Sequence, residues 1–387
     1  MIYDKIENLF TIINGYAFNS QNYSKSGIEV IRITNVQKGY LSTEDKKFYP
    51  KDEQLNYCLL KENDILISLT GNVGRVAVVK KEHLPAYLNQ RVACLRSKKN
   101  DSIDQRYLFN FLNSSFFEKI CIKNSNGVAQ KNMSTVWLKN FRIPLPAMEE
   151  QKKIAGRLDA VSDLLAKQKQ LLAEQDTLIQ SLFYDMFGDP IKNNKGWKID
   201  ELQNVATSRL GKMLDAKKQT GKNNRFYLAN QNVKWFDFDF KDLRKMDFNE
   251  EDQKEFKLEN GDVLVCEGGD VGRSAIWKSN LKECYFQKAL HRIRCNLKKI
   301  VPIFLVRLFY TISLHNGFDK IVGNKATIAH LTGVKLKTLK IPVPPLELQE
   351  KFAAIVEQIE SEKSKIKSAI AETQTLFNAL MAEYFEE

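Results

Sequence analysis

The chain has 387 residues, a length that favours two domains, each with its own hydrophobic core. Hydrophobic residues at 43% and aromatic residues at 10% exclude a largely disordered chain, and no apolar run approaches the roughly 20 residues that span a bilayer. A formal net charge of +12 indicates a polyanionic partner, and without a signal-like N-terminal segment we expect a cytoplasmic protein.

Each half of the chain opens with a β-rich region. Short β-prone runs at 30–36, 65–69 and 75–79 alternate with glycine and asparagine turns, and helical patterns follow at 105–122 and, in the second half, at 302–314. These segments predict mixed α/β (α+β) globules with helices packed on a sheet. The glycines of GNVGR and GDVGR are more typical of tight turns between strands than of a phosphate-binding loop.

Two motifs recur at a constant offset of 198 residues. LKENDILISLTGNVGR at 60–75 matches LENGDVLVCEGGDVGR at 258–273, and FRIPLPAMEEQKKI at 141–154 matches LKIPVPPLELQEKF at 339–352. Near the starts of the two copies, 6–15 resembles 202–211 with a slightly smaller offset. A period this long is too large for a solenoid and indicates a tandem duplication of a domain followed by a helix.

Each copy ends in a long helix. After IPLP and IPVP the chain continues for about 40 residues without another proline. Alternating steps of four and three give largely apolar seams from Ile154 to Met186 and from Phe352 to Tyr384. We expect the seams to pair as an antiparallel coiled coil that spaces two domains related by a pseudo-two-fold axis. Packing of each helix on its own domain, or homodimerisation, is the alternative.

The distribution of charge separates the helices from the globules. Residues 147–187 carry a net charge of −2 and residues 346–387 a net charge of −5, so the remaining chain carries +19. This pattern favours globules that contact phosphates and helices that contact protein.

The sequence contains none of the common catalytic motifs. There is no phosphate-binding P-loop, no HExxH, no GxSxG, no dinucleotide-binding GxGxxG and no signature of an adenine methyltransferase. The six cysteines and four histidines are scattered without metal-ligand spacing. We therefore expect no catalytic residue, no metal and no cofactor. The rival hypothesis is a methyltransferase or nuclease too diverged for motif recognition.

The whole chain resembles the specificity (S) subunits of type I restriction-modification systems. The resemblance rests on LTGNVGR and EGGDVGR, on IPLPAMEEQ and IPVPPLELQ, and on SLFYDMFGDP followed by GW at 196–197. The first copy lacks the GW that opens the second.

The resemblance implies a non-catalytic subunit that recognises a bipartite site in double-stranded DNA. It implies target recognition domains at 1–146 and 188–344 and spacer helices at 147–187 and 345–387. Its implied partners are two methylation subunits and restriction subunits, which would carry the adenine methyltransferase and ATP-dependent activities. A free-standing sequence-specific DNA-binding regulator is the alternative function.

The candidate DNA-binding residues are basic and amide side chains in polar segments of both copies, because Lys and Arg contact phosphates while Arg, Lys, Asn and Gln recognise base edges. In the first copy they are Arg32, Asn35, Lys38, Asn89, Gln90, Arg91, Lys131 and Asn132. In the second copy they are Arg225, Asn230, Asn232, Lys234, Gln287, Lys288, Arg292, Asn324 and Lys325.

Each candidate has an ordinary structural alternative. A surface lysine is usually just solvated, and Gln90 and Gln287 fit equally well as buried amides that both copies share. Residues that differ between matched positions are better candidates for base contacts. The shared Arg75 and Arg273 are expected to hold the fold or phosphates.

Overall fold

The computed structural model describes residues 2–98, 102–127, 131–215, 219–278, 283–315, 317–318 and 330–386. The chain divides into two compact units. Unit 1 comprises Met1–Lys169 and Ser368–Glu387, and unit 2 comprises Gln170–Lys367. Each unit therefore contains one globule and one half of each long helix.

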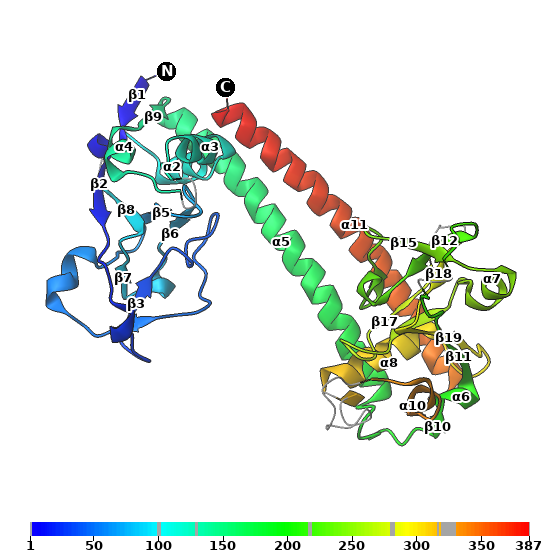
Figure 1. Ribbon diagram of the computed structural model, residues 1–387. Helices are drawn as coiled ribbons and strands as arrows, with labels where there is room; N and C mark the ends of the chain where they lie inside the picture. The colour runs from blue at the N-terminus through cyan, green and yellow to red at the C-terminus, as the bar shows by residue number, and fades with distance from the viewer. Residues whose placement is uncertain are drawn as a thin grey trace. The chain divides into compact units, whose positions relative to one another are not determined.

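The globule of unit 1 is built around a four-stranded antiparallel sheet in the order β2-β8-β5-β6 (Figure 1). A three-stranded sheet has the order β4-β3-β7, and β1 pairs with β9. The strands are β1 Ile2–Lys5, β2 Phe10–Asn14, β3 Ile28–Ile31, β4 Phe48–Tyr49, β5 Ile65–Ser68, β6 Val76–Val78, β7 Ala86–Leu88, β8 Val92–Ser97 and β9 Arg142–Leu145. The helices are α1 Ile6–Leu9, α2 Gln105–Leu112, α3 Ser115–Lys123, α4 Thr135–Asn140 and the first half of α5 Met148–Phe187.

The globule of unit 2 repeats this topology. Its four-stranded sheet has the order β11-β19-β16-β17, its three-stranded sheet the order β15-β12-β18, and β10 pairs with β20. The strands are β10 Ile199–Glu201, β11 Ala206–Leu210, β12 Asn224–Leu228, β13 Val233–Lys234, β14 Asp237–Phe238, β15 Arg244–Asp247, β16 Val263–Cys266, β17 Ser274–Ile276, β18 Tyr285–Phe286, β19 Leu290–Cys295 and β20 Lys340–Pro342. The helices are α6 Leu202–Val205, α7 Glu250–Phe256, α8 Pro302–Leu314, α10 Gly333–Lys337 and the first half of α11 Leu346–Phe385.

Alternating side chains of the central sheet enter two different cores. In unit 1, Ile65 and Ile67 pack toward α2, α3 and the long helices, while Leu66 between them packs toward the three-stranded sheet. In unit 2, Val263 and Val265 face the helical side and Leu264 faces the other sheet. Because side chains alternate across a strand, a fully buried strand between two layers is apolar at every position.

Two predicted elements differ from the structure. The strand predicted at 30–36 ends at Ile31, because the chain turns over Arg32–Asn35 and Asn35 bonds back to the turn. The helix predicted at 105–122 is two helices, α2 and α3. They are separated because Ser114 caps a new helix, its hydroxyl accepting a hydrogen bond from the Phe117 backbone N–H.

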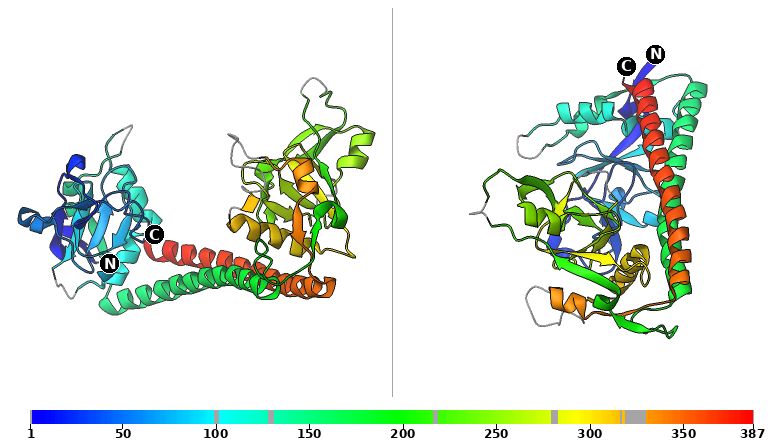
Figure 2. Two further views of the ribbon diagram at one scale, coloured as in Figure 1. Left: turned by 90° about the horizontal axis from the view of Figure 1, so that it is seen from below. Right: turned by 90° about the vertical axis from the view of Figure 1, so that its right-hand side faces the viewer.

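Both long helices span 40 residues, or about 60 Å at 1.5 Å per residue. Within unit 2 the end of α5 lies beside the start of α11, and the two helices run antiparallel (Figure 2). There Phe183 of α5 packs on Phe352 of α11, and Asp176 pairs with Lys363. In unit 1, Arg157 of α5 donates a hydrogen bond to the Tyr384 hydroxyl of α11. The predicted antiparallel pairing of the long helices is confirmed.

The seam positions predicted from the sequence are those that the helices bury. Between residues 160 and 178 of α5, only Val161, Leu165, Gln168, Leu172 and Gln175 are buried or half-buried. Every other position in that stretch is exposed to solvent, including Leu164, Leu171 and Leu178. This middle part of α5 touches little besides its partner helix, as a coiled coil requires.

Candidate nucleic-acid interface

In unit 1 three segments distant in sequence meet around the turn between β5 and β6. The Leu69 N–H donates to the Arg91 carbonyl over 2.9 Å, the Gly71 N–H to the Lys131 carbonyl over 2.9 Å, and the Met133 N–H to the Leu69 carbonyl over 2.7 Å. We call segments 69–75, 89–91 and 131–133 the turn cluster of unit 1.

Unit 2 builds the same cluster with the same backbone bonds. The Glu267 N–H donates to the Ala289 carbonyl over 2.9 Å, and the Leu331 N–H to the Glu267 carbonyl over 2.7 Å. They match the bonds that join Leu69, Arg91 and Met133 in unit 1, with each residue number 198 higher. Segments 267–273, 287–289 and 330–331 form the turn cluster of unit 2.

The shared glycines of GNVGR and GDVGR are required by the turn. Gly74 and Gly272 have φ values of 83° and 84°, in the left-handed region that favours glycine. A Cβ atom would also lie 2.9 Å from Cys121 Cβ at Gly74 and 2.3 Å from the Phe318 ring at Gly272. These glycines therefore form the turn and pack it closely on the globule, in agreement with the prediction.

The shared arginines of these motifs hold a neighbouring loop. Arg75 Nη1 donates to Gln37 Oε1 over 2.7 Å, and Arg273 Nη2 donates to the Asn230 carbonyl over 3.1 Å. In both units the arginine thus connects the turn to the loop that follows the first strand of the smaller sheet. Arg75 holds this loop through a side-chain amide and Arg273 through a backbone carbonyl, and both thus contribute to the fold.

Several predicted DNA-binding residues are exposed in the turn clusters or on the adjoining loops. Those with exposed side chains are Lys38, Gln90, Arg91, Lys131, Asn132, Lys234 and Lys288, and Gln287 is half-buried. Lys38 forms an ion pair with Glu118, with 2.7 Å between Nζ and Oε2. The exposed set is basic and amide-rich, the chemistry that contacts phosphates and base edges.

Asn35 and Asn232 are buried and fold their loops in an identical way. Asn35 Oδ1 accepts from the Arg32 N–H at 3.0 Å, and its Nδ2 donates to the Ser42 carbonyl at 3.2 Å. Asn232 Oδ1 accepts from the Ala229 N–H at 2.9 Å, and its Nδ2 donates to the Asp239 carbonyl at 2.9 Å. With both amide atoms engaged, these two side chains hold the loop and have no free edge for a base.

Arg32, Asn89 and Arg292 are also held by the protein. Arg32 Nη2 lies 2.9 Å from Asp45 Oδ2, and Asn89 Oδ1 accepts from the Arg91 N–H at 3.1 Å. Arg292 Nη1 donates to the carbonyls of Glu255 and Lys257, and the guanidinium stacks over the Phe286 ring. Burial lowers the pKa of Arg292. We therefore assign these three residues structural roles.

The remaining predicted residues are half-buried or lie outside the described residues. Arg225 is half-buried and pairs with Glu283 at 3.4 Å. Asn230 is half-buried and its Nδ2 donates to the Gly268 carbonyl at 3.0 Å. Asn324 and Lys325 lie outside the described residues.

The backbone pairing also corrects the match of Gln90 with Gln287 and adds one candidate DNA-binding residue. Tyr16 bridges Asn89 in unit 1, and Lys212 bridges Gln287 in unit 2. Gln287 is thus the counterpart of Asn89, and Lys288 that of Gln90. The exposed His330, beside Leu331, is the counterpart of Asn132. Sequence reasoning missed His330, although the offset of 198 from Asn132 points directly to it.

The described residues contain no group of three or more His, Cys, Asp or Glu side chains that could hold a metal ion. Burial raises the pKa of the Cys121 thiol to about 12 and that of Cys266 to about 11, which keeps both protonated at neutral pH. None of the helices in the described ranges is long and apolar enough to cross a membrane.

One relative and one solved structure resemble the chain over nearly its full length, and another relative resembles about half of it. The type I restriction enzyme StySPI specificity subunit of Salmonella potsdam is 23% identical, covering 98% of this chain and 87% of that one. The MjaVIII specificity subunit of Methanocaldococcus jannaschii is 31% identical, covering 46% of this chain and 44% of that one. The S subunit structure from M. genitalium superimposes with a TM-score of 0.59 at 14% identity, covering 99% of this chain and 96% of that one.

The family model matches the chain twice. The type I restriction modification DNA specificity domain aligns with residues 3–175 and again with residues 194–373, so the two matches follow the two copies of the duplication. With this coverage and the repeated fold described above, the chain belongs to the family of specificity subunits of type I restriction-modification systems.

Proposed function

We propose that the chain recognises a bipartite site in double-stranded DNA, with one half-site bound by the globule of each unit. The long helices would set the gap between the half-sites. The chain would contribute no catalytic residue, and methylation and restriction subunits would dock on it to supply the chemistry. With DNA as its ligand it would work in the cytoplasm.

One observation carries this proposal: the turn cluster is built twice with the same backbone and different exposed side chains. Matched positions carry Gln90 and Lys288, Arg91 and Ala289, and Asn132 and His330. A common frame with different side chains is expected of two modules that present different donors and acceptors to different sequences.

The side chain beside each turn differs in the same way. In unit 1, Ile33 lies beside Gly71 and helps to line a hollow of about 250 Å³. In unit 2 the counterpart of Ile33 is Asn230, whose amide lies beside Gly269. An apolar side chain next to one turn and an amide next to the other would present different chemistry to a base edge.

The distribution of charge supports a nucleic-acid ligand for the globules. The chain outside residues 147–187 and 346–387 carries a net charge of +19, while those two helical segments are acidic. Phosphate contacts supply affinity that does not depend on sequence, and acidic helices would be repelled by DNA. The helices are therefore left to contact the partner subunits.

Methylation mapping tests the proposal. The full chain, assembled with the methylation subunits of its own host, is incubated with labelled S-adenosylmethionine and a DNA library, and the methylated sites are sequenced. We expect one split sequence with a fixed gap. The double variant Gln90→Ala/Arg91→Ala should lower the preference for the native base at one or two positions of one half-site. We expect a fall of roughly ten- to a hundredfold, or about 1–3 kcal/mol for each lost base contact.

A matched variant controls for general damage. Gln54 and Arg142 are exposed residues of the same two types in the same globule, and Arg142 lies on β9, outside the turn cluster. Gln54→Ala/Arg142→Ala should leave both half-sites unchanged. Methylation by the chain without any partner, or an unsplit recognition sequence, would contradict the proposal. Tight specific binding with no co-purifying methylation subunit would favour a free-standing regulator.

A further inference from the structure

A lysine occupies a position of the α11 seam, which is otherwise apolar in unit 2. The seam of α11 runs through Phe352, Val356 and Ile359 and then reaches Lys363, whose side chain is only 8% exposed. A buried ammonium group is costly unless it is paired and hydrogen-bonded, so its partners require explanation.

Lys363 connects three helices through a chain of charges. Its Nζ lies 2.5 Å from Asp176 Oδ1 on α5 and 3.0 Å from Glu360 Oε1 on α11. The same Glu360 oxygen accepts a hydrogen bond from Arg307 Nη2 on α8, at 2.8 Å. We call Asp176, Arg307, Glu360 and Lys363 the Lys363 network. It joins the second globule, through α8, to both long helices.

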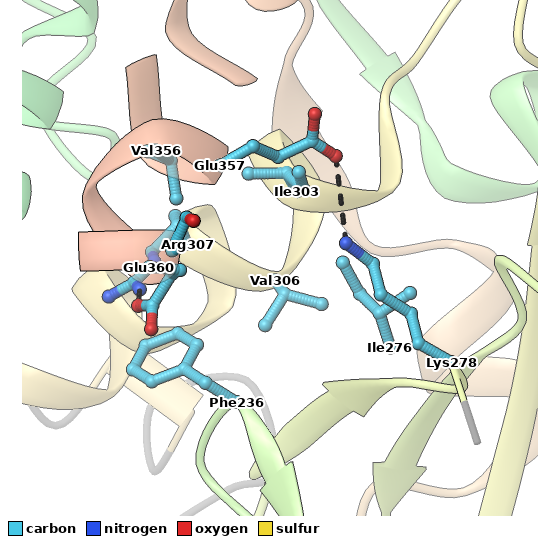
Figure 3. A pocket seen from close by; sticks show the side chains of 10 residues that line it. Phe236, Ile276, Lys278, Ile303, Val306, Arg307, Val356, Glu357 and Glu360 are labelled. Carbon is cyan, nitrogen blue, oxygen red and sulfur yellow. Dashed lines mark hydrogen bonds and ion pairs between the residues drawn. The ribbon is translucent and has the colours of Figure 1, made fainter. Parts of the chain in front are cut away.

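The globule holds Arg307 firmly at its end of the network. The Arg307 side chain is 5% exposed, and its guanidinium carbon lies 3.6 Å from the centre of the Phe236 ring. Figure 3 shows Arg307, Glu360 and Phe236 together at the wall of a cleft of about 460 Å³ between α8 and α11. Burial lowers the pKa of Arg307, and the Glu360 carboxylate acts in the opposite direction.

The duplicated fold does not itself need this network. The matched residues of unit 1 are Leu165 for Lys363 and Ser162 for Glu360, each 198 positions earlier, and Asn110 for Arg307, because Asp104 before α2 matches Val301 before α8. Leu165 is buried in the seam of unit 1, where an apolar side chain serves the same position. Replacing a buried ion pair with well-packed apolar residues is often neutral or stabilising. The charges in unit 2 therefore call for an explanation other than stability.

Geometry supplies that explanation. Hydrophobic attraction has no preferred direction, whereas charge-assisted hydrogen bonds require donor and acceptor at short distances and fixed angles. Because the network bonds α8 to α11 and α11 to α5 in series, it favours the one arrangement of these three helices that satisfies all of its bonds.

We propose that Lys363, with Asp176 and Glu360, is a positioning residue that fixes the second globule on the helix pair and so restricts the chain to one gap length. This rests on the proposed function, in which the helices set the gap between two half-sites. Without the network the globule would keep its fold and its half-site, and the complex would accept sites whose gap is one base pair longer or shorter.

Two measurements on the full chain test the proposal. Methylation of a DNA library with gaps of every length is mapped as above, with the methylation subunits present. Separately, pulsed electron spin resonance measures the distance between spin labels on cysteines introduced at the exposed positions Lys254 on α7 and Thr177 on α5, the helix to which Lys363 bonds. The native thiols are buried or half-buried, which favours labelling of the introduced ones.

Lys363→Leu, which copies the residue of unit 1, should fold with an unchanged or higher melting temperature. Its distance distribution should broaden, and its preference for the native gap over gaps one base pair away should fall at least tenfold. Lys363→Arg should keep the native gap, because the charge and the pairing remain. The matched control is Lys365→Leu, an exposed lysine two residues away, which should behave as the wild type.

The outcomes separate this inference from the proposed function. If the wild type methylates a split site and Lys363→Leu keeps the native gap, the positioning role is wrong, whatever the distance distribution shows. If the wild type methylates no split site, the proposed function fails. A broader distance distribution in Lys363→Leu would then still show that Lys363 fixes the globule on the helices.

Discussion

Two buried glutamines perform the same task at the start of each long helix. Gln151 Oε1 accepts from the Asp104 N–H, and its Nε2 donates to the carbonyls of Ser102 and Pro146. Gln349 Oε1 accepts from the Val301 N–H, and its Nε2 donates to the carbonyls of Lys299 and Pro344. Each amide thus bonds the first turn of a long helix to the loop that precedes α2 in unit 1 and α8 in unit 2.

Gln349→Leu should therefore destabilise unit 2. Leucine keeps the size of the side chain but leaves one buried N–H and two carbonyls without their partner, at a cost of about 2–4 kcal/mol in the free energy of unfolding. Urea denaturation measures the change. Gln358→Leu, an exposed glutamine on the same helix, should change the free energy by less than about 0.5 kcal/mol. Equal effects of the two variants would contradict the role given to Gln349.

His291 should make the stability of the chain sensitive to acid. Burial lowers its pKa, although its ring nitrogen Nε2 lies 2.8 Å from the Leu331 carbonyl. The unfolded chain therefore binds a proton that the folded chain does not, so stability falls as the pH drops through and below the ordinary histidine pKa of about 6.5. The counterpart in unit 1 is the buried Ala93.

His291→Ala should reduce this acid sensitivity. Melting temperatures of the wild type and the variant between pH 5 and pH 8 provide the measurement. We expect the variant to be less stable at pH 8, where it lacks the hydrogen bond to Leu331, and the difference to shrink toward pH 5. A difference that stays constant with pH would show that His291 does not titrate in this range.

At the scale of elements, α5 carries two adjacent leucines with opposite environments. Leu172 is half-buried in the seam, while the neighbouring Leu171 is 44% exposed. Because an α-helix turns 100° per residue, neighbours face different directions, and only one of the two leucines can face the partner helix.

Leu172→Asp should weaken the helix pair by several kcal/mol, because a carboxylate in the seam loses apolar burial and must be desolvated or protonated. Ile370→Asp, at a half-buried seam position of α11, should act in the same way. Leu171→Asp is the matched control and should cost less than about 1 kcal/mol. Thermal melting and capture of the methylation subunits provide the readout. Wild-type behaviour of both seam variants would refute the role of the seam.

For the whole molecule, the duplication predicts modular recognition. Replacing residues 1–146 with the corresponding globule of a relative should alter one half of the recognised sequence and preserve the other half and the gap. Methylation-site mapping with the partner subunits present would show the result. If one exchange altered both half-sites, the two globules would recognise DNA jointly, and our proposal of independent half-sites would be wrong.

The sequence by itself determined the duplication, the long helices and the family. The helices α5 and α11 begin within one residue of the predicted starts at 147 and 345, because a proline pair followed by about 40 residues of seam periodicity is a local signal. The turn glycines were also predictable, since Gly74 and Gly272 recur in matched motifs and adopt the same positive φ.

Only the tertiary structure decided which polar side chains face solvent. The sequence offers Asn35 and Gln90 as equal candidates, yet Asn35 is buried by carbonyls of a loop that returns to it, while Gln90 is exposed. Such partners depend on how segments pack, which no local pattern encodes. Lys363 shows the same limit: periodicity placed it in the seam, but its ion pairs come from α5 and, through Glu360, from α8, elements that only the fold brings together.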